Sequence, residues 1–121
     1  MKQRAIEIIE EEGKRLCRVP LGPRAERHAE IWEKDWNFLL KLGCPGNWNH
    51  INNNYVTACA PKASGNHVLV ARVLLDAGPG ESVIYRDGNP LNLRRENLTL
   101  VESAKGSRRD REYLSVPRVL A

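Results

Sequence analysis

A polar loop between two short apolar runs constrains this 121-residue chain more than any other feature. The runs 82–85 and 98–101 are rich in β-branched and aromatic residues, which favour strands. The loop 86–97 opens with turn-forming residues, and its Gly88 can adopt a backbone conformation that a side chain would resist. The sequence therefore predicts two strands joined by a structured loop.

The segment 68–101 contains a series of short motifs, in this order: Ala71-Arg72, Gly78-Pro79-Gly80, Val83, Asp87-Gly88-Asn89, Leu91-Asn92, Arg94 and Asn97-Leu98. With these motifs the segment resembles the HNH nuclease family as carried by phages and mobile introns. The resemblance covers about 34 of the 121 residues and keeps the order and spacing of the family pattern. It implies a ββα unit, with a strand, the patterned loop, a second strand and a helix.

Three residues of this loop are expected to have structural roles. Asp87 and Gly88 turn the chain out of the first strand. Asn97 resembles the middle Asn of the family name, and we expect its side chain to hydrogen-bond the loop backbone and fix the loop shape. These roles concern the fold and require no catalysis.

The catalytic residues of the family are missing from this chain. Tyr85 stands where the resemblance places the general base His, Ile84 stands where it places a metal ligand, and Gly106 falls near a further ligand position. The reaction needs a base with a pKa near neutral and a cage for one divalent ion. Tyrosine has a pKa of about 10 and isoleucine binds no metal. We therefore expect an inactive copy with no metal or other cofactor.

An enzymatic alternative stays open at this point. A divergent metal-dependent HNH endonuclease would use His50 or His67 as its base and Mg²⁺ as its cofactor. His50 lies in 49–54, which imitates the family's strand-end string but has no glycine after it, and His67 lies close to a predicted strand. We interpret the first as a loop residue and the second as a surface or core residue.

HNH nucleases bind duplex DNA with their ββα unit, so the resemblance implies duplex DNA as a partner. Arginine presents a planar fork of donors that suits phosphates. Contact with four to six phosphates would give a log–log salt slope of about −4 to −5. In the alternative, Arg94 and Arg95 pair with Glu96 and Glu102 on the surface. The expected nucleic-acid contacts are Arg86, Asn89, Asn92, Arg94, Arg95, Arg108, Arg109 and Arg111.

The remainder of the chain is less specific. Apolar residues at helical spacing predict helices over 2–16 and 24–42, followed by a polar loop over 43–54. The predicted fold class is α+β, with N-terminal helices followed by a small antiparallel sheet and an HNH-like ββα unit. The predicted domains are a helical region, 1–45, and an HNH-like domain with a basic C-terminal helix and tail, 46–121. The other predicted elements are strands 55–59 and 68–70 and helices 71–77 and 103–114.

Composition limits the setting of the protein. Nineteen basic and 15 acidic residues give a net charge of +4, which permits a nucleic-acid partner without demanding one. Three cysteines without a C-x-x-C motif suit a reducing cytoplasm. No apolar run approaches the ~20 residues of a membrane span, and no secretory signal is recognised. We expect a cytoplasmic protein, in the host cytoplasm if the chain is phage-encoded.

Three functional hypotheses follow. The leading one is a nucleic-acid-binding protein of phage origin on a catalytically inactive HNH-like scaffold, with DNA versus RNA left open. The second is the divergent endonuclease. The third is a phage inhibitor that binds a host nucleic-acid-handling or defence complex. In that case Ile6, Trp32 and Trp36 of the N-terminal helices would supply a partner or homodimer surface.

Overall fold

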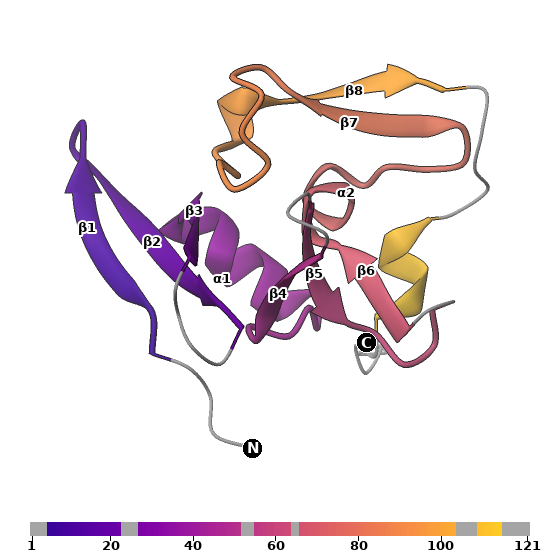
Figure 1. Ribbon diagram of the computed structural model, residues 1–121, viewed down its shortest axis with the longest axis horizontal. Coiled ribbons are helices and arrows are strands. Elements are labelled where there is room, and N and C mark those ends of the chain that lie inside the picture. The colour runs from indigo at the N-terminus through magenta and orange to yellow at the C-terminus, as the bar shows by residue number, and fades with distance from the viewer. Residues whose placement is uncertain (1–4, 23–26, 52–54, 64–65, 104–108, 115–121) are drawn as a thin grey trace, which may run out of the picture.

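The computed structural model describes residues 5–22, 27–51, 55–63, 66–103 and 109–114 (Figure 1). Two short 3₁₀ turns, Arg95–Asn97 and Asp110–Tyr113, accompany the helices and strands of this part of the chain. In chain order the elements are β1 (Glu7–Glu11), β2 (Lys14–Leu21), β3 (Arg27–Trp32), α1 (Glu33–Lys41), β4 (Trp48–Ile51), β5 (Tyr55–Cys59), β6 (His67–Leu69), α2 (Val70–Leu75), β7 (Glu81–Tyr85) and β8 (Leu98–Glu102).

Strands β1 to β6 form one mixed sheet, and β7 and β8 form a separate two-stranded sheet. Leu16 pairs with both β1 and β3, so these strands lie on opposite edges of β2. Leu21 pairs with β3 and, in parallel, with Trp48 of β4, so β4 continues along the edge that β1 occupies. Strands β5 and β6 complete the sheet beyond β4. Figure 1 shows β7 and β8 set apart above it.

The predicted helix over 2–16 is wrong for its described part, which forms the antiparallel hairpin β1–β2. The two residues of its turn, Glu12 and Gly13, have φ values of +53° and +78°. Two consecutive residues with positive φ make the turn that matches the twist of a hairpin. Gly13 is therefore a turn residue of a β-hairpin rather than a helix residue, and the β-branched Ile8 and Ile9 occupy a strand.

The predicted helix over 24–42 is correct only for Glu33–Lys41. Residues 27–32 form β3, where the alternate residues Ala29 and Ile31 are fully buried. Pairing with β2 along this whole strand overrides the helical spacing of the apolar residues. The predicted fold class is therefore wrong, since a mixed sheet built largely from the N-terminal part replaces the N-terminal helices.

The two tryptophans expected at a partner or dimer surface lie in β3 and α1. Trp32 and Trp36 are 8% and 5% exposed, so both are buried.

The predicted loop 43–54 is wrong as well, because Trp48–Ile51 forms β4. Trp48 packs edge-on against Trp36 with 5.2 Å between ring centroids and donates its indole N–H to the Pro45 carbonyl at 2.8 Å.

The second half of the chain follows the prediction closely. Strand 55–59 is confirmed as predicted, and the predicted strands 82–85 and 98–101 and helix 71–77 are confirmed with ends shifted by one or two residues. The strand predicted at 68–70 is His67–Leu69. Of the predicted helix 103–114, the described part contains only the 3₁₀ turn Asp110–Tyr113.

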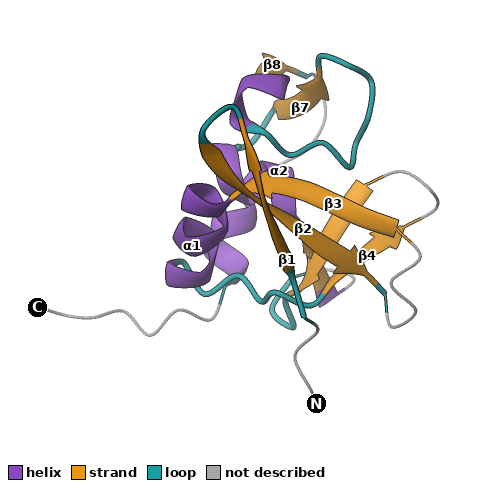
Figure 2. Ribbon diagram, turned by 90° about the vertical axis from the view of Figure 1, so that its left-hand side faces the viewer, coloured by secondary structure: helices purple, strands orange, loops and turns teal. Residues whose placement is uncertain are grey.

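The two helices form one layer over the sheet. Helix α1 packs against β2 and β3, and α2 packs against β5, β6 and α1. Figure 2 shows the helices together on one side of β1 to β4. A single core cluster takes residues from both parts of the chain, from Cys17 to Leu114. Among the described residues, neither helix is long and apolar enough to cross a membrane.

Candidate nucleic-acid interface

The loop 86–97 is attached to the large sheet through β3. The Glu30 N–H donates to the Leu91 carbonyl at 2.8 Å, and the Leu93 N–H donates to the Glu30 carbonyl at 2.8 Å. This short parallel bridge covers the edge of β3 that faces away from β2. Leu93 is fully buried at the junction. The sheet edge thus fixes where the loop and the β7–β8 hairpin sit.

Hydrogen bonds inside the loop converge on Asp87 and Asn97. Asp87 Oδ1 accepts from the Asn89 N–H at 2.8 Å and Asn97 Nδ2 at 2.9 Å. Asn97 Oδ1 accepts from the Asp87 N–H at 3.0 Å, and Asn97 Nδ2 donates to the Asn92 carbonyl at 3.0 Å. Hydrogen bonds from the Asn92 side chain and the Asn89 N–H lower the pKa of Asp87. Gly88 has a φ of +74°, in the left-handed region.

Arg94, an expected DNA contact, is bound within the protein. Its Nε and Nη2 donate to the two carboxylate oxygens of Glu11 at 2.8 and 2.7 Å. Its Nη1 donates to Glu30 at 3.0 Å and to Asn92 Oδ1 at 2.9 Å. The guanidinium also lies 5.5 Å from the centre of the Trp32 ring. Arg94 makes four hydrogen bonds and its side chain is only 14% exposed, so few of its five N–H donors remain for a phosphate.

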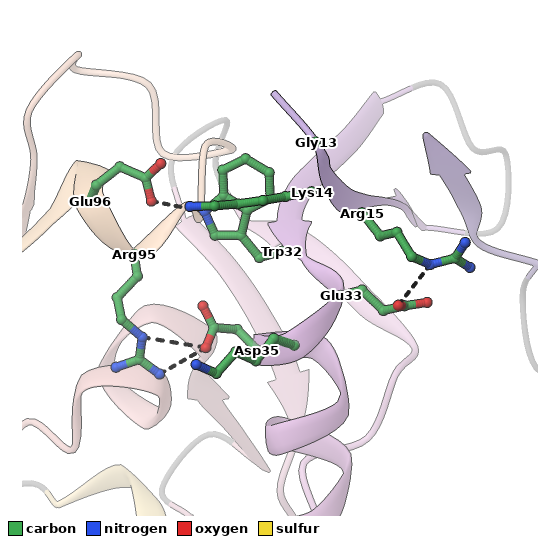
Figure 3. A pocket seen from close by; sticks show the side chains of 9 residues that line it. Gly13, Lys14, Arg15, Trp32, Glu33, Asp35, Arg95 and Glu96 are labelled. Atoms are coloured by element: carbon green, nitrogen blue, oxygen red, sulfur yellow. Dashed lines mark hydrogen bonds and ion pairs between the residues drawn. The ribbon is translucent and has the colours of Figure 1, made fainter. Parts of the chain in front are cut away.

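Arg95 lines a hollow of about 680 Å³. The hollow lies between the β1–β2 turn, the start of α1 and the 3₁₀ turn Arg95–Asn97 at the end of the loop. Its Nη2 donates to the buried carboxylate of Asp35 at 2.9 Å. Two further acids of the hollow, Glu33 and Glu96, accept from Arg15 and from the Trp32 indole, each at 2.8 Å (Figure 3). Four cations and three acids line this hollow, and Arg15 and Arg95 each pair with one of the acids, so it does not single out an anionic ligand.

Arg109 and Arg111 lie beyond the C-terminal end of α2. Arg111 donates from Nε to the Val73 carbonyl at 2.8 Å, in the last turn of the helix. Arg109 is 42% exposed and lies 3.6 Å from both Asp76 and Glu112, which is the geometry of a weak surface pair. Arg108, also predicted as a contact, lies outside the described residues.

The pairing of Arg72 with Asp110 gave no signal in the sequence. Arg72 Nε and Asp110 Oδ1 are 2.8 Å apart, and Asp110 is fully buried. Asp110 Oδ2 accepts from the Leu69 N–H at 2.9 Å. Arg72 also donates to the carbonyls of Glu81 and Gly78. This pair joins the start of α2, the segment leading into β7 and the turn after β8. Arg72 was one of the residues that carried the resemblance, but nothing in the sequence marked Asp110 as its partner.

Of the expected arginine contacts within the described residues, Arg86 has the fewest partners inside the protein. Its guanidinium donates to the Thr99 hydroxyl at 3.3 Å, across the β7–β8 hairpin. Among the residues described here, it is bound to no carboxylate and no backbone carbonyl through its side chain. Ile84, two positions earlier, is 47% exposed. Asn89 is exposed at the turn of the loop that follows. The hairpin therefore presents a cation, a large apolar side chain and a neutral amide to solvent.

Tyr85, where the resemblance to HNH nucleases would place a base, lines a small hollow of about 170 Å³. Its ring stacks on Tyr55, with centroids 6.3 Å apart and 26° between the planes. Burial, followed by the neighbouring Tyr55, raises the pKa of Tyr85 to about 12. The phenol therefore stays protonated near neutral pH and is a poor general base. The other lining residues are Leu69, Ala71, Arg72, Ser82 and Val83.

Neither of the alternative bases lies at this hollow. His50 sits in β4, where its Nδ1 is 3.4 Å from Nη1 of Arg27. His67 pairs with Cys59, at the opposite end of β5 from Tyr55. Within the described ranges, no three His, Cys, Asp or Glu side chains are grouped closely enough to hold a metal ion. The structure thus brings neither histidine to Tyr85.

Comparison of the chain with models of known protein families, with curated proteins and with solved structures gives no match.

Proposed function

We propose that this protein binds nucleic acid through the exposed face of the β7–β8 hairpin and does not cut it. The observation that carries the proposal is Arg86, an exposed guanidinium without a carboxylate partner in the described part of the chain, close to the exposed Ile84. A two-stranded ribbon is narrow enough to enter the major groove of DNA. Arginine at its surface supplies a phosphate contact, and the net charge of +4 favours the encounter.

The residues at the hollow argue for binding without hydrolysis. Tyr85 has its pKa raised to about 12, so only a minute fraction is ionised near pH 7. Ile84 offers no ligand atom, and Ala71 lines the hollow with a methyl group. These side chains provide neither a base for water nor oxygen or nitrogen ligands for a divalent ion.

The expected number of phosphate contacts is smaller than the arginine count implies. The side chains of Arg94 and Arg111 are 14% and 28% exposed, whereas Arg86, Arg95 and Arg109 keep substantial exposure. Two or three phosphates neutralised on duplex DNA give a log–log salt slope of about −2 to −3. A protein with this interface binds more weakly, and with less dependence on salt, than one that uses every arginine.

A fluorescence anisotropy titration tests the proposed function. The purified chain is titrated into labelled duplex DNA at several salt concentrations with Mg²⁺ present, and the DNA is then analysed on a denaturing gel. We expect salt-dependent binding that leaves both strands intact. Strand cleavage that requires Mg²⁺ would restore the endonuclease hypothesis. A lack of binding to duplex and single-stranded nucleic acid at low salt would overturn the proposal.

We also propose a cytoplasmic setting for this activity. All three cysteines, Cys17, Cys44 and Cys59, are free thiols. Burial raises the pKa of Cys17 to about 11 and that of Cys44 to about 12, so both resist ionisation and reaction. Free thiols are the usual state of cysteine in a reducing compartment.

A further inference from the structure

Two tyrosines meet where β5 begins and β7 ends. Tyr55 opens β5 and is 41% exposed, and Tyr85 closes β7 and is more buried. Their rings are stacked with 6.3 Å between centroids. Helix α2 packs against both strands, which fixes the distance between them. Tyr55 therefore forms the exposed edge of a hollow whose inner wall is Tyr85.

The hollow has the size and lining of a site for one flat ring. Its volume of about 170 Å³ is below the ~300 Å³ at which pockets for drug-sized molecules begin. Leu69, Ala71 and Val83 supply apolar walls, and Ser82 supplies a hydroxyl. Its cation, Arg72, already pairs with the buried Asp110, so the hollow favours an aromatic group over a phosphate.

The tyrosine hydroxyls are available to a ligand. Within the described part of the chain, neither Tyr55 nor Tyr85 has a hydrogen-bond partner for its hydroxyl. A phenolic O–H donates and accepts, and so does the hydroxyl of Ser82. The edge of a nucleobase carries both donors and acceptors. The hollow thus offers a stacking surface together with groups that match the edge of a base.

We propose that this hollow, which we call the Tyr55–Tyr85 pocket, holds one unpaired nucleobase of a nucleic-acid strand. The base stacks against Tyr55, within the hollow that Val83 and Tyr85 line. Stacking on aromatic side chains is the usual way in which proteins hold single strands, and it tolerates any base. This inference rests on the proposed function and names the form of nucleic acid that the hairpin prefers.

The pocket predicts a preference among nucleic acids. A base inside a perfect duplex is stacked and paired, and its removal costs a few kcal/mol. A single strand has no such cost. We therefore expect the protein to bind single strands more tightly than a perfect duplex of the same length at the same salt concentration. DNA and RNA single strands carry the same base rings, and a comparison of the two shows which backbone the hairpin prefers.

The test uses the full chain and single-stranded oligonucleotides, in DNA and RNA forms, that contain the fluorescent base 2-aminopurine. Tyr55→Leu removes the ring but keeps an apolar side chain, and Tyr55→Phe is the matched control that keeps the ring. We expect Tyr55→Leu to weaken single-strand binding by about 5- to 100-fold. Tyr55→Phe should change it by less than about threefold, because a hydrogen bond contributes less than stacking. Circular dichroism checks that both variants fold.

The two proposals fail in different ways. If the wild-type chain binds with salt dependence, but Tyr55→Leu binds single strands as tightly as wild type, the pocket is overturned and the hairpin interface stands. If the 2-aminopurine fluorescence is unchanged on saturation at every position of the strand, the pocket is overturned as well. If no nucleic acid binds at low salt, the proposed function itself is overturned.

Discussion

Arg94 and Glu11 are 83 residues apart in the sequence and are joined by two parallel hydrogen bonds of 2.7 and 2.8 Å. Glu11 ends the first strand of the chain, and Arg94 lies in the loop between β7 and β8. The pair fastens the loop to the N-terminal hairpin on the same surface where Glu30 accepts from Arg94. Arg94, one of the arginines predicted to contact DNA, therefore stabilises the contact between the loop and the N-terminal hairpin.

Arg94→Ala is expected to reduce stability rather than to act selectively on nucleic-acid binding. The substitution removes the partner of Glu11 and one of the two ion pairs of Glu30, and we expect a loss of about 1–3 kcal/mol in the free energy of unfolding. Urea denaturation measures it, with Arg86→Ala as a control that should lose less than about 0.5 kcal/mol. Equal stability of the two variants would contradict the assignment.

Asp110→Asn is expected to be the more damaging change. Asp110 is fully buried and pairs with Arg72, so its neutralisation removes the negative charge that faces this guanidinium. Breaking such a buried pair costs about 3–5 kcal/mol. Glu112→Gln, in the same 3₁₀ turn but with a 68% exposed side chain, is the matched control and should be near neutral. A similar thermal midpoint for both variants would rule out a structural role for the pair.

Asn97→Asp tests the hydrogen bonds of the loop through the pH dependence of the variant's stability. The new carboxylate replaces the amide that donates to Asp87 Oδ1, so two acceptors face each other where 2.9 Å now separates donor and acceptor. We expect the variant to be less stable than wild type by about 1–3 kcal/mol at pH 7. Protonation of either carboxyl near pH 4 relieves the repulsion, so the difference from wild type should shrink there. A difference that stays constant between pH 7 and pH 4 would contradict this arrangement.

The raised pKa of Tyr85 predicts that the protein loses stability at alkaline pH. Its pKa is raised from 10 to about 12, chiefly by burial, so the folded state disfavours the phenolate. The stabilisation is complete below pH 10 and is lost as the pH rises from 10 to 12, by about 1–3 kcal/mol. Cys17 and Cys44 titrate in an overlapping range, so the measured quantity is the difference between wild type and Tyr85→Phe.

Absorbance at 295 nm follows the same group directly. The chain has three tyrosines, and the ionisation near pH 12 should disappear in Tyr85→Phe. If the alkaline titration of the variant keeps its last step, Tyr85 is not the buried phenol.

The patterned loop could be predicted because its interactions are local. Asp87, Gly88 and Asn97 lie within eleven positions of one another, and their hydrogen bonds close within the loop. Turn chemistry of this kind depends on residue type and spacing alone. Strands β7 and β8 could be predicted equally well, because short apolar runs flank the loop.

The N-terminal half could not be predicted in the same way. The residues of β1 and β3 match a helical spacing, but both strands pair with β2, and pairing is not visible in a local pattern. The signal that was present is Glu12-Gly13, a two-residue hairpin turn. The partners of Arg72 and Arg94 lie 38 and 83 positions away, and their charge pairs depend on the finished fold.

The salt dependence of binding by Arg86→Gln tests the central claim most directly. Lys62→Gln is the matched control, since it also removes one exposed positive charge, just after the end of β5 opposite Tyr55. We predict that Arg86→Gln weakens binding to duplex and single-stranded DNA and lowers the magnitude of the log–log salt slope by about 1, while Lys62→Gln leaves both unchanged. Equal slopes and affinities for wild type and Arg86→Gln would contradict the hairpin interface.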